Sequence, residues 1–191
     1  MIKRINELIK ESIRVKEKLL ETQSFEIDRA AKLIISCLKR GGKVIVFGNG
    51  GSAADSQHFA AELVGRFKKE RKPLPAIALT TNTSILTAIA NDYNYEDVFQ
   101  KQIEALGDKR DVAIGISTSG KARNVIKGII TAKKMKMKTI CLTGERGTDL
   151  ARLVDVSIIV PSADTARIQE AHITVEHILC ELIEDTLFKD K

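Results

Sequence analysis

Residues 48–62 combine a glycine-rich turn with a histidine and a carboxylate. The turn 48–52 has the sequence Gly-Asn-Gly-Gly-Ser and follows the apolar run 44–47, and His58 and Glu62 come four residues apart just after it. A buried strand that feeds such a turn and then a helix makes an anion site, because free backbone N–H groups and the helix dipole favour negative charge. Residues four apart share one face of a helix. The pattern therefore predicts a phosphate-binding loop beside an acid/base or metal-binding pair.

A second polar turn follows a second apolar segment. Residues 117–120 read Ser-Thr-Ser-Gly and come directly after the segment 112–116. In parallel sheets, ligands bind outside the carboxyl ends of the strands. A single hydroxyl would be enough for an ordinary helix cap. Three hydroxyls in a row, together with the first glycine-rich turn, favour a site for a phosphate dianion.

The pair His58 and Glu62 also has a simpler interpretation as a solvated helix face. The residues around the pair, including Phe59 and Leu63, are apolar and could partly desolvate it. Desolvation raises the pKa of a carboxylate and suits a general base. The position after the glycine-rich turn therefore favours a functional pair.

The segment 167–177 holds two of the three histidines. Apolar residues at positions 168, 171, 175, 178 and 182 predict one buried helical stripe, with the histidines at its rim. We expect His172 to be such a rim residue. His177 lies beside the apolar run 178–179, but periodicity alone does not choose between the two. Asn91 and Asp92 read as a turn at a helix end, or as an amide and a carboxylate for sugar hydroxyls.

Length and composition are those of one ordinary soluble domain. The chain has 191 residues, 43% hydrophobic and 29% charged, with no run long enough to cross a membrane. Its first residues are charged throughout and lack an apolar secretory segment. The cysteines at 37, 141 and 180 show no metal-type spacing, and we expect reduced thiols in a cytoplasm, with Cys37 and Cys180 filling the core. The sequence thus predicts a cytoplasmic protein with no membrane partner.

The formal net charge of +6 has three possible meanings. Dispersed surface charge ranks first, steering of an anionic substrate second, and nucleic-acid binding a distant third. Aromatic residues make up 4% of the chain and tryptophan is absent, so platforms for base stacking are not expected. We therefore expect no nucleic-acid partner.

The elements that position these residues alternate along the chain after an opening helical region. Apolar residues at helical spacing predict two opening helices, one up to about residue 20 and one over 27–38 that ends at the glycines 41–42. Short strands are expected at 43–47, 76–79, 112–116, 139–142 and 156–160. Helices are expected at 53–66, 84–90, 95–106, 122–135, 148–153 and 165–188. This order predicts an α/β fold with a parallel sheet of about five strands covered on both faces. The charged, proline-containing stretch 67–75 is expected to be a surface loop.

Taken together, these segments resemble the SIS (sugar isomerase) family over nearly the whole chain. The matching stretches are GNGGSAADSQHFAAEL, PAIALT, TAIANDY, GISTSG and RIQEAHITVEHIL. The resemblance implies a flavodoxin-like three-layer sandwich with a five-stranded parallel sheet, formed by residues 1–191 as a single SIS domain. It also implies a homotetramer that is built with the terminal helices, including residues 1–40.

The resemblance further implies an intramolecular aldose–ketose isomerase. The reaction would convert sedoheptulose 7-phosphate to D-glycero-D-manno-heptose 7-phosphate, which opens the ADP-heptose route to lipopolysaccharide or another surface glycan. By the family's pattern, Glu62 would be the base that works through an enediol, and His177 would be its acid partner. The residues that would contact the phosphorylated seven-carbon sugar are Asn49, Gly50, Gly51, Ser52, Glu62, Asn91, Asp92, Ser117, Thr118, Ser119 and Gln169.

Many members also bind zinc, and the resemblance implies one ion per subunit held by His58, Glu62, Gln169 and His177. Histidine and glutamate are ordinary zinc ligands, whereas a glutamine oxygen is a weaker one. Gln169 and His177 are separated by about 12 Å along a helix, so they converge on one ion only with difficulty. Either neighbouring chains supply ligands or the last helix lies obliquely across the pocket.

The chain departs from the family's pattern at the second polar turn. Many members read STSGNS, whereas this chain reads STSGKAR, so that Ala122 stands where a hydroxyl is usual. Lys121 or Arg123 could compensate for the lost phosphate contact.

Three alternative functions remain. A non-catalytic adaptor of the same family that binds the replication initiator lacks the carboxylate and histidine that match Glu62 and His177. A sugar-phosphate-sensing regulatory domain usually comes with a DNA-binding module, for which this chain has no room. The third alternative is another sugar-phosphate isomerase.

Overall fold

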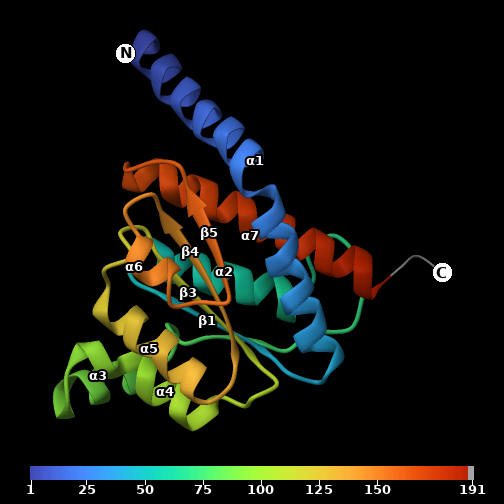
Figure 1. Ribbon diagram of the computed structural model, residues 1–191, viewed down its shortest axis with the longest axis vertical. Coiled ribbons are helices and arrows are strands. Elements are labelled where there is room, and N and C mark those ends of the chain that lie inside the picture. The colour runs from blue at the N-terminus through green and yellow to red at the C-terminus, as the bar shows by residue number, and fades with distance from the viewer. Residues whose placement is uncertain (189–191) are drawn as a thin grey trace.

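Five parallel strands form the centre of the computed structural model, which describes residues 1–188 (Figure 1). The strands are β1 (Val44–Gly48), β2 (Ala76–Ala78), β3 (Val112–Ser117), β4 (Lys138–Gly144) and β5 (Val156–Val160). Their order in the sheet is β2-β1-β3-β4-β5, and every neighbouring pair is parallel. This is the flavodoxin-like order, so the predicted fold class is confirmed.

Helices cover both faces of the sheet, so β1 and β3 at its centre are buried on both sides, whereas alternate residues of the edge strand β5 are only half-buried. In β1, Val44 and Val46 belong to one apolar cluster while Ile45 and Phe47 belong to the other, as the two-residue period of a strand requires. The first face is covered by α1 (Ile2–Lys39), α2 (Gly51–Val64) and α7 (Thr165–Leu187). The second is covered by α3 (Thr83–Asp92), α4 (Val98–Leu106), α5 (Arg123–Lys134) and α6 (Thr148–Ala151).

The prediction of two opening helices is wrong, because residues 2–39 form the single helix α1. The polar stretch 22–24 does not interrupt it. The hydroxyls of Thr22 and Ser24 donate to the carbonyl groups of Lys18 and Leu20, at 2.8 and 2.6 Å, which is compatible with helical backbone. With neither glycine nor proline in this region, nothing forces a break. The end of the helix before Gly41, whose φ is +75°, is as predicted.

The first half of α1 projects beyond the rest of the molecule (Figure 1). Its apolar side chains Ile5, Ile9 and Ile13 are about half exposed, whereas burial begins at Val15 and Leu19. Further along, the Gln23 side chain accepts a hydrogen bond from the Ile159 N–H of the edge strand β5, at 3.0 Å. The second half of α1 therefore packs against the sheet, whereas the first half carries a half-exposed apolar stripe beside Arg167 and Glu170 of α7.

The two turns singled out in the sequence lie side by side. Gly48 at the end of β1 pairs in register with Ile116 near the end of β3, so the turns 48–52 and 117–120 leave the same sheet edge next to each other. The chain moves outward from β1 to β2 and then returns to β3, which makes this edge the topological switch point. Ligands of open α/β sheets bind at such a point.

The other predicted helices also differ from the structure in their bounds, mostly by one or two residues. The segment expected as one helix over 95–106 begins with a 3₁₀ turn, η1 (Tyr95–Asp97), and continues as α4. The helix expected over 84–90 is longer and ends at Asp92. Among residues 1–188, no helix combines the length and the apolar character needed to cross a membrane.

The surface loop after α2 is attached to α7 by a buried ion pair that the sequence did not indicate. Arg71 donates to the Glu184 carboxylate at 2.9 Å, and the two side chains are only 1% and 2% exposed. Arg71 also donates to the carbonyl groups of Glu62 and Leu63 at the end of α2, both at 2.8 Å. The Glu184 carboxylate accepts from three consecutive backbone N–H groups of the loop, residues 67–69.

These contacts keep Glu184 ionised although it is buried. Burial by itself would raise the pKa of the carboxyl, but the three backbone N–H groups and the Arg71 guanidinium hold the pKa below its usual range. The ion pair therefore connects the carboxyl-terminal end of α2 to α7 with every buried charge paired.

We predict that Glu184→Gln lowers the free energy of unfolding by about 3 kcal/mol or more, because it leaves the Arg71 charge buried without a counter-ion. Urea unfolding at neutral pH measures this difference. Glu181→Gln is the matched control on the same helix: Glu181 pairs with Lys68 at the surface, with both side chains about half exposed. That change should cost about 1 kcal/mol or less. Equal losses in the two variants would contradict the prediction.

Candidate active site

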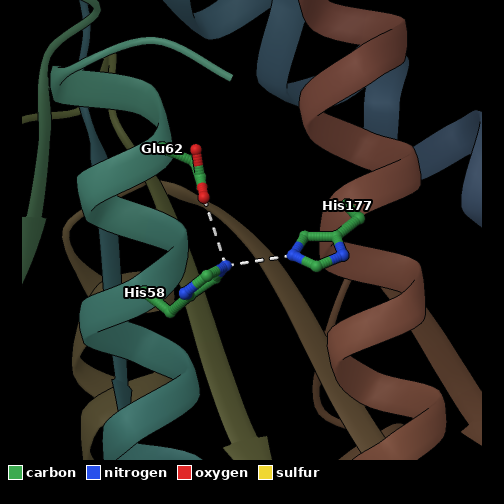
Figure 2. Close-up of side chains that lie close together, drawn as sticks. All are labelled: His58, Glu62 and His177. Carbon is green, nitrogen blue, oxygen red and sulfur yellow. Dashed lines mark hydrogen bonds and ion pairs between the residues drawn. The ribbon is translucent and has the colours of Figure 1, made fainter. Parts of the chain in front are cut away.

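Three side chains of α2 and α7 converge on one another. Figure 2 shows His58 and Glu62 pointing from α2 and His177 pointing from α7 towards a common centre. The His58 Nε2 atom lies 3.0 Å from Nε2 of His177 and 3.3 Å from Oε1 of Glu62. Three possible ligand atoms of these residues lie within 4.8 Å of one another. The structure therefore brings together three of the four residues predicted as metal ligands.

The distances in this cluster fit a zinc ion. Nitrogen and carboxylate ligands lie about 2.0–2.2 Å from zinc, so two ligands at a tetrahedral angle are about 3.3 Å apart. The two contacts of His58 Nε2 are close to this value. One ring nitrogen carries at most one proton and cannot donate to the carboxylate and the second imidazole together. A cation between the three groups would satisfy all their lone pairs at once.

Phe67 forms one wall of the cluster. Its ring stacks on the His177 ring, with 5.4 Å between the centroids and 30° between the planes. The Phe67 N–H donates to Oε1 of Glu184 at 2.9 Å. The buried ion pair described above therefore fixes the aromatic residue that packs against a site histidine.

Three further titratable side chains lie on the same two helices. His172 is 0% exposed and Glu176 is 1% exposed, and among residues 1–188 neither of their side chains makes a hydrogen bond of good geometry. Burial, and secondarily the charge of Asp55, raises the pKa of Glu176 to about 9. Burial also raises the pKa of Asp55, against the effect of His58. The interior behind the cluster is thus a low-dielectric region that disfavours charge.

A cavity of about 160 Å³ lies at the two turns on the switch-point edge. Ser52 and Ser117 line it and are 3% and 6% exposed, yet their hydroxyl groups make no hydrogen bond within residues 1–188. Thr118 and Ser119 complete the hydroxyl wall. Nearly buried hydroxyl groups that remain unpaired and open to a cavity suit an oxyanion ligand.

The helices that begin at this cavity have no side-chain caps. The N-cap positions of α2 and α5 are Gly50 and Ala122, and neither has a side-chain cap hydrogen bond. Within the first turn of α5, the Val125 N–H donates to Oδ1 of Asn124 at 2.9 Å. The alternative that the hydroxyls of residues 117–119 are ordinary caps of α5 is therefore wrong, since the cap position falls on an alanine. The first two N–H groups of each helix, those of residues 51, 52, 123 and 124, have no hydrogen-bond partner among residues 1–188 and remain available for a ligand.

The side chain of Asn49 holds the first turn in place. Asn49 and Asn124 exchange two hydrogen bonds through their amide groups, each 2.9 Å long. The Tyr95 hydroxyl donates to Asn49 Oδ1 at 3.3 Å. The Asn49 amide is therefore occupied by hydrogen bonds to α5 and η1, which hold the turn at the edge of the cavity.

Gln169 lies with the hydroxyl groups, about two helical turns from His177. It lines the same cavity, and its amide packs so closely against Gly51 that a Cβ there would overlap it. Its role as a metal ligand stays a prediction. Asn91 and Asp92 are exposed at the end of α3 and hydrogen-bond to each other at 2.9 Å. Neither residue lines the cavity described above.

The prediction for the segment 167–177 needs two corrections. His172 is fully buried rather than at the rim, while Ile178 and Leu182 of the expected buried stripe are 37% and 38% exposed. The buried face of α7 is rotated because it packs between α1 and α2, which the sequence does not reveal. Sequence reasoning also missed Phe67, Arg71 and Asn124, for which only proximity to the motifs gave any signal. Cys37, Cys141 and Cys180 are all free and buried.

Comparison with known proteins identifies the family of this chain. The family model for the SIS domain matches residues 7–144. The chain belongs to the SIS domain family. Within that family it is similar to a phosphoheptose isomerase of Thermodesulfovibrio yellowstonii, 54% identical over 186 residues that cover 97% of this chain and 92% of the relative. It is also 54% identical over 185 residues to a phosphoheptose isomerase of Aquifex aeolicus, covering 97% of each chain.

Solved structures of phosphoheptose isomerases also resemble this chain, at lower sequence identity. The phosphoheptose isomerase of Neisseria gonorrhoeae superposes with a TM-score of 0.91 at 45% identity, covering 96% of this chain and 98% of that chain. The phosphoheptose isomerase of Francisella tularensis gives 0.93 at 40% identity, with the same coverage.

We predict that His172 makes the protein less stable in mild acid. Burial lowers its pKa from 6.5 to about 4, although an interaction with the Thr143 backbone raises it in part. The unfolded chain therefore binds a proton first, and stability that is complete above pH 6.5 is lost as the pH falls towards 4, by on the order of 3 kcal/mol. Urea unfolding of His172→Leu should show a weaker decline than the parent over this range. The same decline in both proteins would contradict the prediction.

Proposed function

We propose that this protein is an aldose–ketose isomerase that converts sedoheptulose 7-phosphate to D-glycero-D-manno-heptose 7-phosphate. The observation that carries the proposal is that α2 borders two sites. A hydroxyl-lined cavity that suits an anion lies at its start, and the cluster His58–Glu62–His177 lies further along the helix. Full-length relatives at 54% identity named phosphoheptose isomerase support the substrate class. Such a product would open the ADP-heptose route to a surface glycan.

The phosphate group of the substrate would bind at the cavity. Hydroxyl groups of Ser52, Ser117 and Thr118 and the first N–H groups of α2 and α5 can donate to its oxygens. Gln169, Ser119 and the turn 49–51 border the same space. Asn91 and Asp92 would meet the sugar hydroxyl groups only if α3 or another copy of the chain brought them closer.

The reacting carbons would then lie at the cluster. Glu62 takes a proton from C1 of the ketose while His177 gives a proton to the C2 carbonyl oxygen, which yields the enediol. Removal of the proton on O1 and return of a proton to C2 then produce the aldehyde. Glu62 faces His58 through Oε1 only, which leaves its other oxygen for proton transfer. A base and an acid on facing helices suit this two-step transfer.

His58, Glu62 and His177 fit a zinc ion, with Gln169 as a proposed fourth ligand. Because a ring nitrogen that binds a metal carries no proton, His177 would then give its proton from its other ring nitrogen. When bound, the ion would polarise the carbonyl group of the substrate. The chain's own contribution is to hold the three ligand atoms together by the packing of α2 against α7 and of Phe67 against His177.

We also propose that residues 1–191 form one SIS domain that acts as a homotetramer in the cytoplasm, with no nucleic-acid partner. The exposed apolar stripe Ile5, Ile9 and Ile13 on the projecting half of α1 supports the self-association. A monomeric mass by light scattering at micromolar concentration would contradict that part of the proposal.

We predict that Glu62→Gln lowers turnover of sedoheptulose 7-phosphate by about 10²-fold or more, because an amide cannot accept the proton. Chromatographic separation of ketose and aldose measures the rate, and a reaction in heavy water should place deuterium at C2 of the product. Glu70→Gln is the control, since the Glu70 side chain is 91% exposed. Normal turnover by Glu62→Gln would remove the base assignment, and no turnover by the parent would remove the proposed reaction.

We predict that zinc stabilises the protein through the three-residue cluster. Zinc at 100-fold excess over its dissociation constant should raise the melting temperature by roughly 5–10 °C. His58→Ala should abolish this shift and lower the bound metal measured by emission spectrometry, whereas Gln57→Ala on the adjacent exposed position should change neither. Equal zinc content and equal shifts in the two variants would exclude the cluster as the metal site.

A further inference from the structure

The hydroxyl-lined cavity lacks a cationic side chain. Its lining residues are all uncharged: Asn49, Ser52, Ile116, Ser117, Thr118, Ser119, Ala122 and Gln169. The N-termini of α2 and α5 each provide the equivalent of about half a positive charge. A phosphate monoester carries about −1.5 to −2 at neutral pH. The cavity alone therefore leaves roughly one negative charge of the ligand without compensation.

A second cavity, of about 140 Å³, adjoins the first and has an exposed arginine in its lining. The two cavities share Thr118 and Ser119, and the second is also lined by Arg146, Ser162 and Thr165. Within residues 1–188, Arg146 forms no ion pair and no side-chain hydrogen bond. Its guanidinium group is therefore a charge that no carboxylate of the described chain neutralises.

The segment that carries Arg146 is fixed to the hydroxyl turn. The Gly144 N–H donates to the Thr118 carbonyl at 3.0 Å, and the Thr143 hydroxyl donates to the Ser117 carbonyl at 2.7 Å. Gly120, with φ of +65°, approaches Gly147 so closely that a Cβ would overlap the Gly147 backbone. These contacts on both sides of Arg146 keep its backbone next to the turn.

The two basic residues that the sequence offered for this purpose are placed differently. Arg123 pairs with Glu96 at 3.1 Å, and its side chain is 79% exposed. Lys121 is exposed and lines neither cavity. Neither residue is positioned to replace the hydroxyl group that Ala122 lacks.

We propose that Arg146 is the cationic partner of the substrate's phosphate group in this protein. The inference rests on the proposed function, because it takes a phosphorylated sugar as the ligand. A guanidinium group can donate two parallel hydrogen bonds to phosphate oxygens, which gives both charge and orientation. Arg146 thereby supplies the charge that the neutral cavity lacks and selects for a dianionic ester over an uncharged sugar.

The test measures steady-state kinetics with sedoheptulose 7-phosphate and the binding of inorganic phosphate by calorimetry. Arg146→Ala should raise KM and weaken phosphate binding by roughly 10- to 100-fold, the usual effect of losing a charge-assisted hydrogen bond. The loss should fall mainly on KM, since the phosphate is remote from the reacting carbons. Arg146→Lys should recover part of the affinity, because a lysine keeps the charge without the paired geometry.

Lys121→Ala and Arg123→Ala are the matched controls, and each should change KM and phosphate affinity less than threefold. Unchanged phosphate affinity in Arg146→Ala, or a larger loss in either control, would overturn the proposal. The calorimetric measurement needs no turnover. If the parent protein binds phosphate but does not isomerise the heptulose ester, the proposed reaction fails while the role of Arg146 is still decided.

Discussion

The site depends on the parallel alignment of α2 and α7 on one face of the sheet. Both helices follow strands of the same parallel sheet, so both run back against the strand direction and parallel to each other. Gln169 meets Gly51 at one end, His177 meets His58 two turns later, and Glu184 meets the end of α2 through Arg71. A shift of either helix along its axis would therefore separate all three contacts.

The alignment of α2 and α7 places a cavity that suits an anion and a cluster that suits a cation at different points along the two helices. At the amino-terminal end, unpaired hydroxyl groups and uncapped helix starts create a positive field without a lining cation. About two helical turns further along α2 and α7, the lone pairs of His58, Glu62 and His177 create a negative field that fits a cation. A substrate with an anionic ester at one end and a polarisable carbonyl group at the other suits both fields at once. His172 and Glu176 of α7 are buried and neutral, so little solvent is present on their side of the cluster to screen the two fields.

Much of this arrangement could be predicted from local sequence patterns. Apolar runs that end in turn residues marked the strands, and both polar turns lie at the sheet edge where such turns belong. The pair His58 and Glu62 lies on one helix face because four residues make about one turn. Predictions that depended on the environment of a residue were less successful. The rim position of His172 and the burial of Ile178 were wrong, because apolar periodicity gives the width of a buried stripe but not its rotation against two neighbouring helices.

The sequence by itself therefore determined the parallel α/β fold and the family, and it identified candidate residues for holding an anion or transferring a proton. These properties reside in short segments whose spacing along the chain is set by helical and strand geometry. Only the tertiary structure decided that His177 meets His58 and that Arg71 is a buried partner of Glu184 rather than one more surface cation. It also decided that Arg146 lines a cavity beside the hydroxyl turn, whereas Lys121 and Arg123 line neither cavity. Each of these pairings joins segments far apart in the chain, and the packing of whole helices and loops fixes them, which no local pattern encodes.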